Sequence, residues 1–403
     1  MSLLPPGLDL PAAENSAFSL VRGLKCNPRS WSDLVAHGQL VMSYFQEIPN
    51  DQTTQLYDVD KSTPLIAASR ILDSTSLPES DLSESERQDW ALMALLSFGM
   101  WGNFLSSSAM KSRLIASKAM SPVTAAIIAT CTPQIAHDFQ EAVSKSETAA
   151  VYLARLVRFL RTGRPEHAAG LEKLLMRCLA NADAFESAML RSSRIVLRHV
   201  IHLSAVSAVA PVLPNLAESY SKRLFATGVR VLLPPQFKAI HDYHLPQASG
   251  NSLVALHTSA GKTLLGELCL LRALDNGPGL AVYLAPYVAL GRQVAEGIRR
   301  RCPTAVRVHT MVGGFRSEDS LDPQMLRELV VATPERFDSI IRNAPQLLSD
   351  LRCIVVDEAH LIGSGIRGIR LEGILARLRM AQKRGCDFRI ILEAVSKPLK
   401  YDK

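Results

Sequence analysis

A short loop of small and hydroxyl residues stands between an apolar run and a helical run. It reads Leu256-His-Thr-Ser-Ala-Gly-Lys-Thr263. A phosphate-binding loop needs backbone N–H groups at a helix N-terminus, a lysine that reaches the terminal phosphates, and a hydroxyl that holds magnesium. Gly261, Lys262 and Thr263 supply these groups, although Leu256 stands where such loops usually begin with Gly or Ala. We therefore predict that this loop binds the phosphates of a nucleotide.

Two adjacent carboxylates form the second chemical signal, about 95 residues further along the chain. Four apolar residues run into them in Cys353-Ile-Val-Val-Asp-Glu-Ala-His360. Asp357 is placed to hold Mg²⁺ directly or through water, and Glu358 can orient and deprotonate an attacking water. An ordinary strand followed by a charged turn would give the same letters. The phosphate loop upstream favours the chemical interpretation.

The elements around these motifs alternate between short apolar runs and helical segments from about residue 231 onward. Alternation of this kind predicts a parallel sheet with helices on both faces, an α/β fold. The strands are expected at 252–256, 280–284, 306–310, 328–332, 353–356 and 388–392. The intervening helices are expected at 262–275, 287–301, 334–342 and 366–383.

The first 229 residues read instead as a helical N-terminal domain, so we expect an all-α domain followed by the α/β domain at 230–403. Ser83 and Glu86 have the spacing of a capping box and predict a helix start. Longer helices are expected over 133–161 and 166–180, where apolar residues recur at three- and four-residue spacing. The arginines from Arg155 to Arg164 are either a ridge that faces nucleic acid or a solvated helix face.

Composition excludes several classes of protein. The 403 residues are 47% hydrophobic and 21% charged, which is globular rather than disordered or collagen-like. Seven cysteines without a CxxC pair argue against a zinc ribbon or a disulfide framework and favour a reducing compartment. No apolar stretch reaches the roughly 20 residues that a membrane span needs. We therefore expect an intracellular, cytoplasmic protein that binds no membrane.

Charge adds a weak hint about partners. Most of the net charge of +7 lies after residue 230, where 23 Lys and Arg oppose 17 Asp and Glu. A basic surface on the second part of the chain favours a polyanionic partner, although the excess is small for 173 residues.

Taken together and in this order, the motifs resemble the first motor lobe of a superfamily 2 DEAD/DEAH-box helicase, most similar to the Ski-like and archaeal repair-helicase group. The resemblance covers about residues 230–395. It rests on Thr258–Thr263, on the Asp357-Glu-Ala-His360 box, on Ala332-Thr-Pro-Glu-Arg-Phe-Asp338, and on Arg367-Gly368 with Leu371-Glu372. The implied fold is a RecA-like lobe with a parallel sheet and a P-loop.

The resemblance implies ATP and Mg²⁺ as cofactors and gives each motif residue a role. Lys262, Asp357 and Glu358 are the implied catalytic residues, with Glu358 as general base. Thr263 and Asp357 are the implied metal ligands. Gln236, in Leu233-Pro-Pro-Gln236, is implied to read the adenine edge, because its amide both donates and accepts. The residues implied to bind the nucleotide are Gln236, Thr258, Ser259, Ala260, Gly261, Lys262, Thr263 and His360.

The resemblance also implies an ATP-dependent helicase or translocase with a single strand of DNA or RNA as partner, and the motif spelling favours DNA. In the family, the loops after the strands grip the phosphodiester backbone largely without sequence preference. The arginines at 292 and 299–301 are either an added electrostatic contact or a solvated run. The residues implied to touch the strand are Pro286, Tyr287, Gly313, Gly314, Thr333, Pro334, Glu335 and Arg336.

Two departures from the family pattern lead to an alternative. Glu393, in Ile390-Ile-Leu-Glu-Ala-Val395, stands where the third motif usually has a hydroxyl that couples hydrolysis to strand movement. The sequence also holds one motor lobe and not the second, so we expect weak or no hydrolysis by this chain. The alternative is a catalytically inactive nucleotide- or nucleic-acid-binding regulatory module, such as a subunit of an antiviral defence complex. Its helical N-terminal domain would then bind a protein partner.

Overall fold

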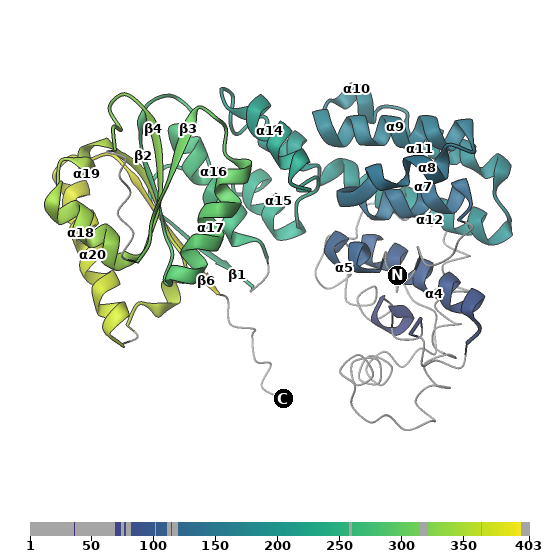
Figure 1. The fold of residues 1–403 in the computed structure, drawn as a ribbon, viewed down its shortest axis with the longest axis horizontal. Coiled ribbons are helices and arrows are strands. Elements are labelled where there is room, and N and C mark those ends of the chain that lie inside the picture. Colours follow the sequence, from purple (N-terminus) through teal and green to yellow (C-terminus); the bar gives the residue numbers. More distant parts are fainter. Residues whose placement is uncertain are drawn as a thin grey trace. The chain divides into compact units, whose positions relative to one another are not determined.

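The computed structural model describes most of the chain from residue 82 onward (Figure 1). The described residues are 36, 69–73, 76–77, 82–100, 102–110, 114, 120–257, 260–313, 321–363 and 365–395. They fall into two compact units. The N-terminal unit comprises residues up to Ala205 together with Gly228–Pro234, and the sheet unit comprises Val206–Thr227 together with the residues from Pro235 onward.

Helices form the described part of the N-terminal unit. The first long one begins where the sequence predicts, because the Ser83 hydroxyl accepts from the Glu86 N–H at 3.3 Å and the Glu86 carboxylate accepts from the Ser83 N–H at 2.9 Å. The α-helices are α4 (Glu84–Met100), α5 (Phe104–Ala109), α7 (Pro122–Cys131), α8 (Gln140–Val143), α9 (Glu147–Thr162), α10 (Pro165–Ala168), α11 (Leu171–Arg177) and α12 (Ala184–His202). Short 3₁₀ turns lie at Pro133–Phe139 and Cys178–Asn181.

Two long helices predicted for this unit are wrong in extent. The segment 133–161 breaks into a 3₁₀ turn, α8 and α9, because Ile135 leaves the helical region and the Ser146 side chain starts a new helix by accepting from the N–H of Ala149. The segment 166–180 is interrupted at Gly170, which has a φ of 78° and begins α11. Apolar spacing continued across both breaks and therefore did not reveal them.

The sheet unit contains six parallel strands, and every predicted strand is confirmed. They are β1 (Ser252–Leu256), β2 (Gly279–Leu284), β3 (Val306–Met311), β4 (Arg327–Ala332), β5 (Leu351–Val356) and β6 (Arg389–Val395). Their order is β1-β6-β5-β2-β4-β3, and each neighbouring pair is parallel. This is the predicted RecA-like lobe, and it follows a helical N-terminal region.

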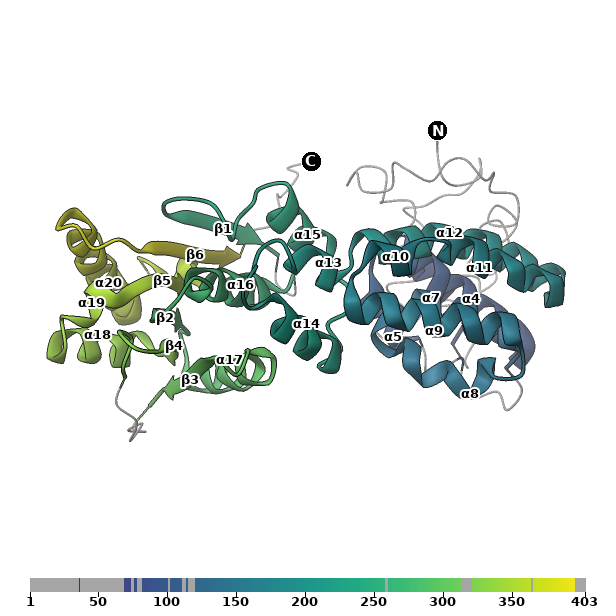
Figure 2. The same cartoon turned by 90° about the horizontal axis from the view of Figure 1, so that it is seen from above.

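Helices cover both faces of this sheet (Figure 2). α16 (Lys262–Leu274) and α17 (Val288–Arg301) lie on one face, and α18 (Pro334–Asn343) and α20 (Gly365–Lys383) lie on the other. The short α19 (Leu347–Asp350) precedes β5. Alternate residues of β2 point to opposite faces of the sheet. On one face, Leu280, Val282 and Leu284 are buried in a hydrophobic cluster that includes residues of α18 and α20. In a sheet of this kind, ligands bind beyond the carboxyl ends of the strands.

A segment before residue 230 packs into the sheet unit. α14 (Ala217–Ala226) presents Tyr220, whose hydroxyl donates to the buried carboxylate of Glu267 on α16 at 2.8 Å. Arg301, at the end of α17, donates to the same carboxylate at 2.6 Å. Just before α14, the Leu216 N–H donates to the buried Asp275 at 2.9 Å. Contacts thus group Val206–Thr227 with the sheet unit, while the domain boundary between 229 and 230 stays a prediction.

The remaining helices of the sheet unit are α13 (Ala205–Val209), which begins at the last residue of the N-terminal unit, and α15 (Pro234–His241). Within the described residues, no helix is both long and apolar enough to cross a membrane.

Candidate nucleotide and nucleic-acid site

The end of the predicted phosphate loop folds as its chemistry requires. Gly261 adopts a left-handed conformation (φ 71°, ψ 36°) directly before α16, so the loop turns into the helix N-terminus. The Gln236 side chain of α15 lies against this turn and donates from Nε2 to the Gly261 carbonyl at 2.9 Å. A Cβ at position 261 would lie 2.1 Å from that nitrogen. Glycine is therefore required both by the backbone and by its neighbour.

The contact between Gln236 and the phosphate loop could not be predicted from the sequence. Its side chain is buried at 5% exposure and braces the phosphate loop. The predicted contact with adenine stays a prediction. Two further residues of the predicted loop, Thr258 and Ser259, lie outside the described residues, and Ala260 is buried beside Gly261.

Lys262 begins α16 and is buried at 9% exposure. Its ammonium donates to the His257 carbonyl at 3.4 Å, so it is held over the loop. It also interacts electrostatically with Asp357 and Glu393, and each interaction favours the charged carboxylate. The lysine and the predicted metal ligand therefore lie in one electrostatic site, although 95 residues separate them in the chain.

The predicted carboxylate pair follows β5 at the carboxyl edge of the sheet. Asp357 is 7% exposed, and its burial raises the pKa of its carboxyl; the interaction with the Tyr283 hydroxyl opposes the rise. Glu358 follows in a left-handed conformation (φ 52°), which side chains rarely adopt. Its N–H donates to Asp357 Oδ1 at 2.8 Å. The Asp357 carboxylate thus stabilises the turn that carries Glu358.

Glu358 and His360 lie side by side after the turn. His360 Nδ1 is 3.0 Å from Glu358 Oε2, but the geometry is not that of a hydrogen bond, and this buried oxygen has no hydrogen-bond partner among the described residues. A buried carboxylate oxygen without a donor is costly unless a ligand or water uses it. The predicted general base therefore has an acceptor site to offer.

Tyr283 is a site residue that the sequence analysis missed. It lies on β2, fully buried, and its hydroxyl interacts with the side chains of Thr263 and Asp357. The same hydroxyl is 3.5 Å from Oε2 of Glu393, which is also fully buried. The signal was a tyrosine near the end of a wholly apolar strand. Its meaning depends on which strands neighbour β2.

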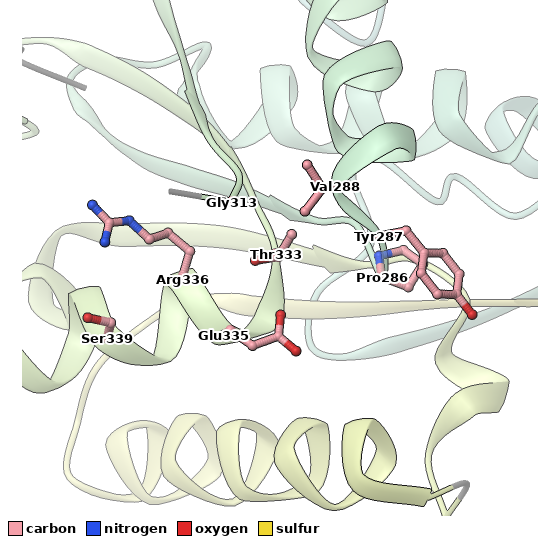
Figure 3. Close-up of a pocket in the computed structure, with 8 residues that line it drawn as sticks. All are labelled: Pro286, Tyr287, Val288, Gly313, Thr333, Glu335, Arg336 and Ser339. Atoms are coloured by element: carbon pink, nitrogen blue, oxygen red, sulfur yellow. The ribbon is translucent and has the colours of Figure 1, made fainter. Parts of the chain in front are cut away.

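A cavity of about 410 Å³ lies beyond the carboxyl ends of β2, β3 and β4 (Figure 3). Figure 3 shows Thr333 between Gly313 and Glu335, with Tyr287 and Arg336 on opposite sides. The lining residues are Pro286, Tyr287, Val288, Gly313, Thr333, Glu335, Arg336 and Ser339. The cavity thus gathers six of the eight residues predicted to touch a strand. Pro334 lies beside it as the first residue of α18, and Gly314 lies outside the described residues.

The charge of this cavity suits an anion. Arg336 Nε is buried and has no hydrogen-bond partner among the described residues. The N-terminus of α18 begins at the same cavity, after Thr333, which makes no side-chain capping bond. Glu335 opposes these positive groups, but its carboxylate pairs with Arg370 of α20 at 3.2 Å. The hollow therefore offers the Arg336 guanidinium and the start of α18 to an anion, and Tyr287, which is 46% exposed, lies at its edge.

The arginine run at the end of α17 divides between structural and exposed residues. Arg301 forms an ion pair with the buried Glu267, so its role is structural. Arg299 and Arg300 pair with Glu296 on the same helix. In the N-terminal unit, Arg155 donates to the backbone carbonyls of Glu166 and His167, so it fastens α10 to α9. None of these contacts tests whether the arginines meet nucleic acid.

The fold and the site define a P-loop nucleotide-binding lobe with an acidic Walker-type turn. Residues 234–392 match the family model "DEAD/DEAH box helicase". This part of the chain is therefore a DEAD/DEAH box helicase domain of the superfamily 2 type.

Several known proteins are similar to part of this chain. The ATP-dependent DNA helicase Hel308 of Methanocella arvoryzae is 36% identical over 170 residues, which are 41% of this chain and 22% of that protein. Hel308 of Pyrococcus abyssi is 32% identical over 164 residues, with the same two shares. The chain thus spans about a fifth of the length of these relatives. A crystallised DEAD box protein from Methanococcus jannaschii is 20% identical, covers 46% of this chain and 49% of its own, and has a TM-score of 0.34.

Proposed function

We propose that this chain carries the ATP-binding motor lobe of an ATP-dependent nucleic-acid helicase or translocase. The observation that carries the proposal is one electrostatic site at the carboxyl edge of the sheet. Lys262 and Thr263 come from the loop after β1, and Asp357 and Glu358 come from the turn after β5. Strand β6 lies between β1 and β5, so the two loops lie two strands apart.

The residues present fit a magnesium nucleotide. The Thr263 hydroxyl and the Asp357 carboxylate both interact with the buried Tyr283 hydroxyl and therefore lie close together, and oxygen ligands of this kind suit Mg²⁺. Bound there, the cation would neutralise charge on the phosphates. Lys262 would bind the same phosphates, and the Gly261 turn would direct backbone N–H groups at them.

Glu358 is proposed as the general base. Its backbone is left-handed, and its buried Oε2 has no hydrogen-bond partner among the described residues, so a water bound beside it would find a free acceptor. His360 Nδ1 lies 3.0 Å from that oxygen. The proposed division of labour is therefore that Asp357 holds the metal and Glu358 acts on water.

The cavity of Figure 3 is proposed as the strand-binding surface. Arg336 and the N-terminus of α18 would meet backbone phosphates, and Tyr287 would stack against a base. We propose DNA rather than RNA as the partner, because relatives that match about two fifths of the chain are named DNA helicases.

Nucleotide titration tests the first half of the proposal. Calorimetry with ATP and Mg²⁺ on the full 403-residue chain should give saturable binding with one site per chain. Lys262→Met should weaken it strongly, because the buried ammonium provides positive charge to the phosphates. Arg379→Met, which removes an exposed cation bonded to Gln382 on α20, is the matched control and should bind as the parent chain does. Equal binding by all three chains would reject the assigned site.

Salt-dependent binding of a single strand tests the second half. Each phosphate neutralised on a single strand contributes about −0.7 to the slope of log K against log salt. A few contacts at the cavity therefore predict a slope of about −2 to −3. Arg336→Met should make the slope less steep by about 0.7, and Arg379→Met should leave it unchanged. Binding that ignores salt would rule out this surface as the strand site.

One observation favours the second candidate, a nucleotide-binding module without turnover. Glu393 replaces the hydroxyl that the third motif usually places at the end of β6, and the structure buries its carboxyl beside the nucleotide site. Binding of ATP with no phosphate release above buffer, measured with and without a single strand on the same preparation, would support this candidate.

A further inference from the structure

The lining of the cavity in Figure 3 includes one carboxylate, that of Glu335. Glu335 is the second residue of α18, and Arg336, whose buried Nε has no hydrogen-bond partner among the described residues, is the third. Figure 3 shows the two side chains extending in different directions from the start of the helix. A carboxylate at this place repels a phosphate that binds in the cavity. Tight binding of a strand therefore requires that the charge of Glu335 is compensated.

The N-terminus of α18 gives this carboxylate a second way to oppose the strand. The first N–H groups of a helix have no partner inside the helix, and they attract negative side chains of the first turn. Thr333, the residue before the helix, makes no side-chain capping bond. A Glu335 side chain turned toward these N–H groups would use the donors that a phosphate needs. Glu335 is therefore a competitor of the phosphate within the chain itself.

The ion pair with Arg370 of α20 answers both problems. Arg370 Nη1 lies 3.2 Å from Glu335 Oε1, so the guanidinium neutralises the carboxylate and draws it toward α20. The two side chains are 43% and 40% exposed, and ion pairs as exposed as this one contribute little to the stability of a fold. The main effect of the pair is therefore on the charge that the cavity presents to a ligand.

Contacts on both sides of Arg370 fix α20 in place. A Cβ at Gly368 would lie 2.5 Å from the Leu361 carbonyl oxygen, so the start of α20 packs directly against the backbone that follows the acidic turn. Two turns beyond Arg370, Arg377 forms an ion pair with Asp338 of α18. Between these contacts, the inner side of α20 is buried in the hydrophobic cluster that it shares with α18. The backbone of Arg370 is thus held at a set distance from the start of α18.

We propose that Arg370 is a positioning residue for the strand-binding cavity, because it holds Glu335 on α20 and leaves Arg336 and the N-terminus of α18 to a backbone phosphate. This inference rests on the proposed function, since it assigns the residue that keeps the same cavity open to an anion. A direct contact between Arg370 and the strand would be a different role. The two roles predict different results in a chain that lacks the charge of Glu335.

The test measures the affinity of the full 403-residue chain for a labelled oligothymidylate by fluorescence anisotropy at low salt. Arg370→Met should weaken binding about fivefold or more, because one unit charge about 4 Å away changes an affinity by this factor even in water. Arg370→Lys keeps the cation and should bind within about twofold of the parent chain. Glu335→Gln should bind at least as tightly as the parent chain. Adding Arg370→Met to Glu335→Gln should change nothing further, because no carboxylate is left to hold.

Arg377→Met is the matched control, because it removes another ion pair between α20 and α18. Its partner Asp338 keeps Arg342 at 2.5 Å and is not among the residues that line the cavity. The control should leave the affinity unchanged. Equal losses in Arg377→Met and Arg370→Met would assign the effect to the packing of the two helices and would overturn the proposal.

The remaining outcomes separate this inference from the proposed function. If the parent chain shows no salt-dependent binding of the strand, the proposed function fails. If the parent chain binds as expected and Arg370→Met keeps the full affinity, only the role of Arg370 is overturned. An undiminished effect of Arg370→Met in the Glu335→Gln chain would show a direct contact with the strand. Weaker binding by Glu335→Gln alone would show that the carboxylate assists the strand, and either result would overturn the positioning role.

Discussion

Replacing Arg301 by methionine perturbs a buried ion pair that joins three helices of the sheet unit. Glu267 is 0% exposed, and its carboxylate accepts from Arg301 Nη2 at 2.6 Å and from the Tyr220 hydroxyl at 2.8 Å. Burial raises the pKa of this carboxyl, and Arg301 opposes the rise. Arg301→Met retains most of the side-chain volume and leaves Glu267 buried with no cation.

The expected loss in the free energy of unfolding can be worked out, because without Arg301 the buried Glu267 carboxylate becomes neutral by binding a proton. At pH 7, holding a proton on a carboxyl with an ordinary pKa of 4.5 costs about 3.4 kcal/mol, at about 1.36 kcal/mol per pH unit. At pH 5 the same step costs about 0.7 kcal/mol. The folded-state pKa of Glu267 in the variant lies above its unfolded value, so stability is retained below pH 4.5 and lost as pH rises. We expect a loss of about 2–3 kcal/mol at pH 7 and under about 1 kcal/mol at pH 5.

The assay must report on the sheet unit. All three tryptophans precede residue 102, so their fluorescence follows the N-terminal part of the chain. Urea unfolding followed by peptide-resolved hydrogen exchange reads α16 and α17 directly. The double variant Glu267→Gln with Arg301→Met has no buried carboxylate at position 267. Its loss of stability should therefore be the same at pH 5 and pH 7. An equal loss of stability at pH 5 and pH 7 in the single variant would refute the electrostatic reasoning and assign the effect to packing.

Three further predictions concern the nucleotide site and the extent of the sheet unit. Gly261→Ala should weaken ATP binding at least tenfold by calorimetry, because its φ of 71° disfavours a side chain and its Cβ would displace a buried glutamine; unchanged affinity would show that the loop adopts another conformation. Lys262→Ala should weaken ATP binding, whereas Glu358→Gln should preserve binding and abolish phosphate release; equal loss of affinity in both would contradict their roles. A chain of residues 206–403 should unfold at a higher urea concentration than one of 230–403, because the shorter chain loses the donors that Tyr220 and Leu216 provide to the buried carboxylates of Glu267 and Asp275; equal midpoints would show that α14 adds nothing.

Much of the site could be predicted from the sequence because its signals are local. Gly261-Lys-Thr263 combines a turn, a charge and a hydroxyl within three residues, and the structure places them at a helix N-terminus. Asp357 and Glu358 are also a local signal, because two adjacent carboxylates directly follow an apolar strand. The six strands were predictable for a similar reason, since continuous apolar runs bounded by turn residues are a local property of strands buried on both faces.

Tertiary structure alone decided which of these local features meet. Glu393 and Tyr283 are 110 residues apart in the chain. Their side chains meet because only β5 lies between their two strands in the sheet, and α16 packs over this face. Tyr220 reads as one more residue of an amphipathic helix until α14 packs beside Glu267. The breaks in the predicted long helices depend on competing caps rather than on apolar spacing. Strand order and helix docking are set by the burial of whole faces, a sum over many distant residues that no short motif carries.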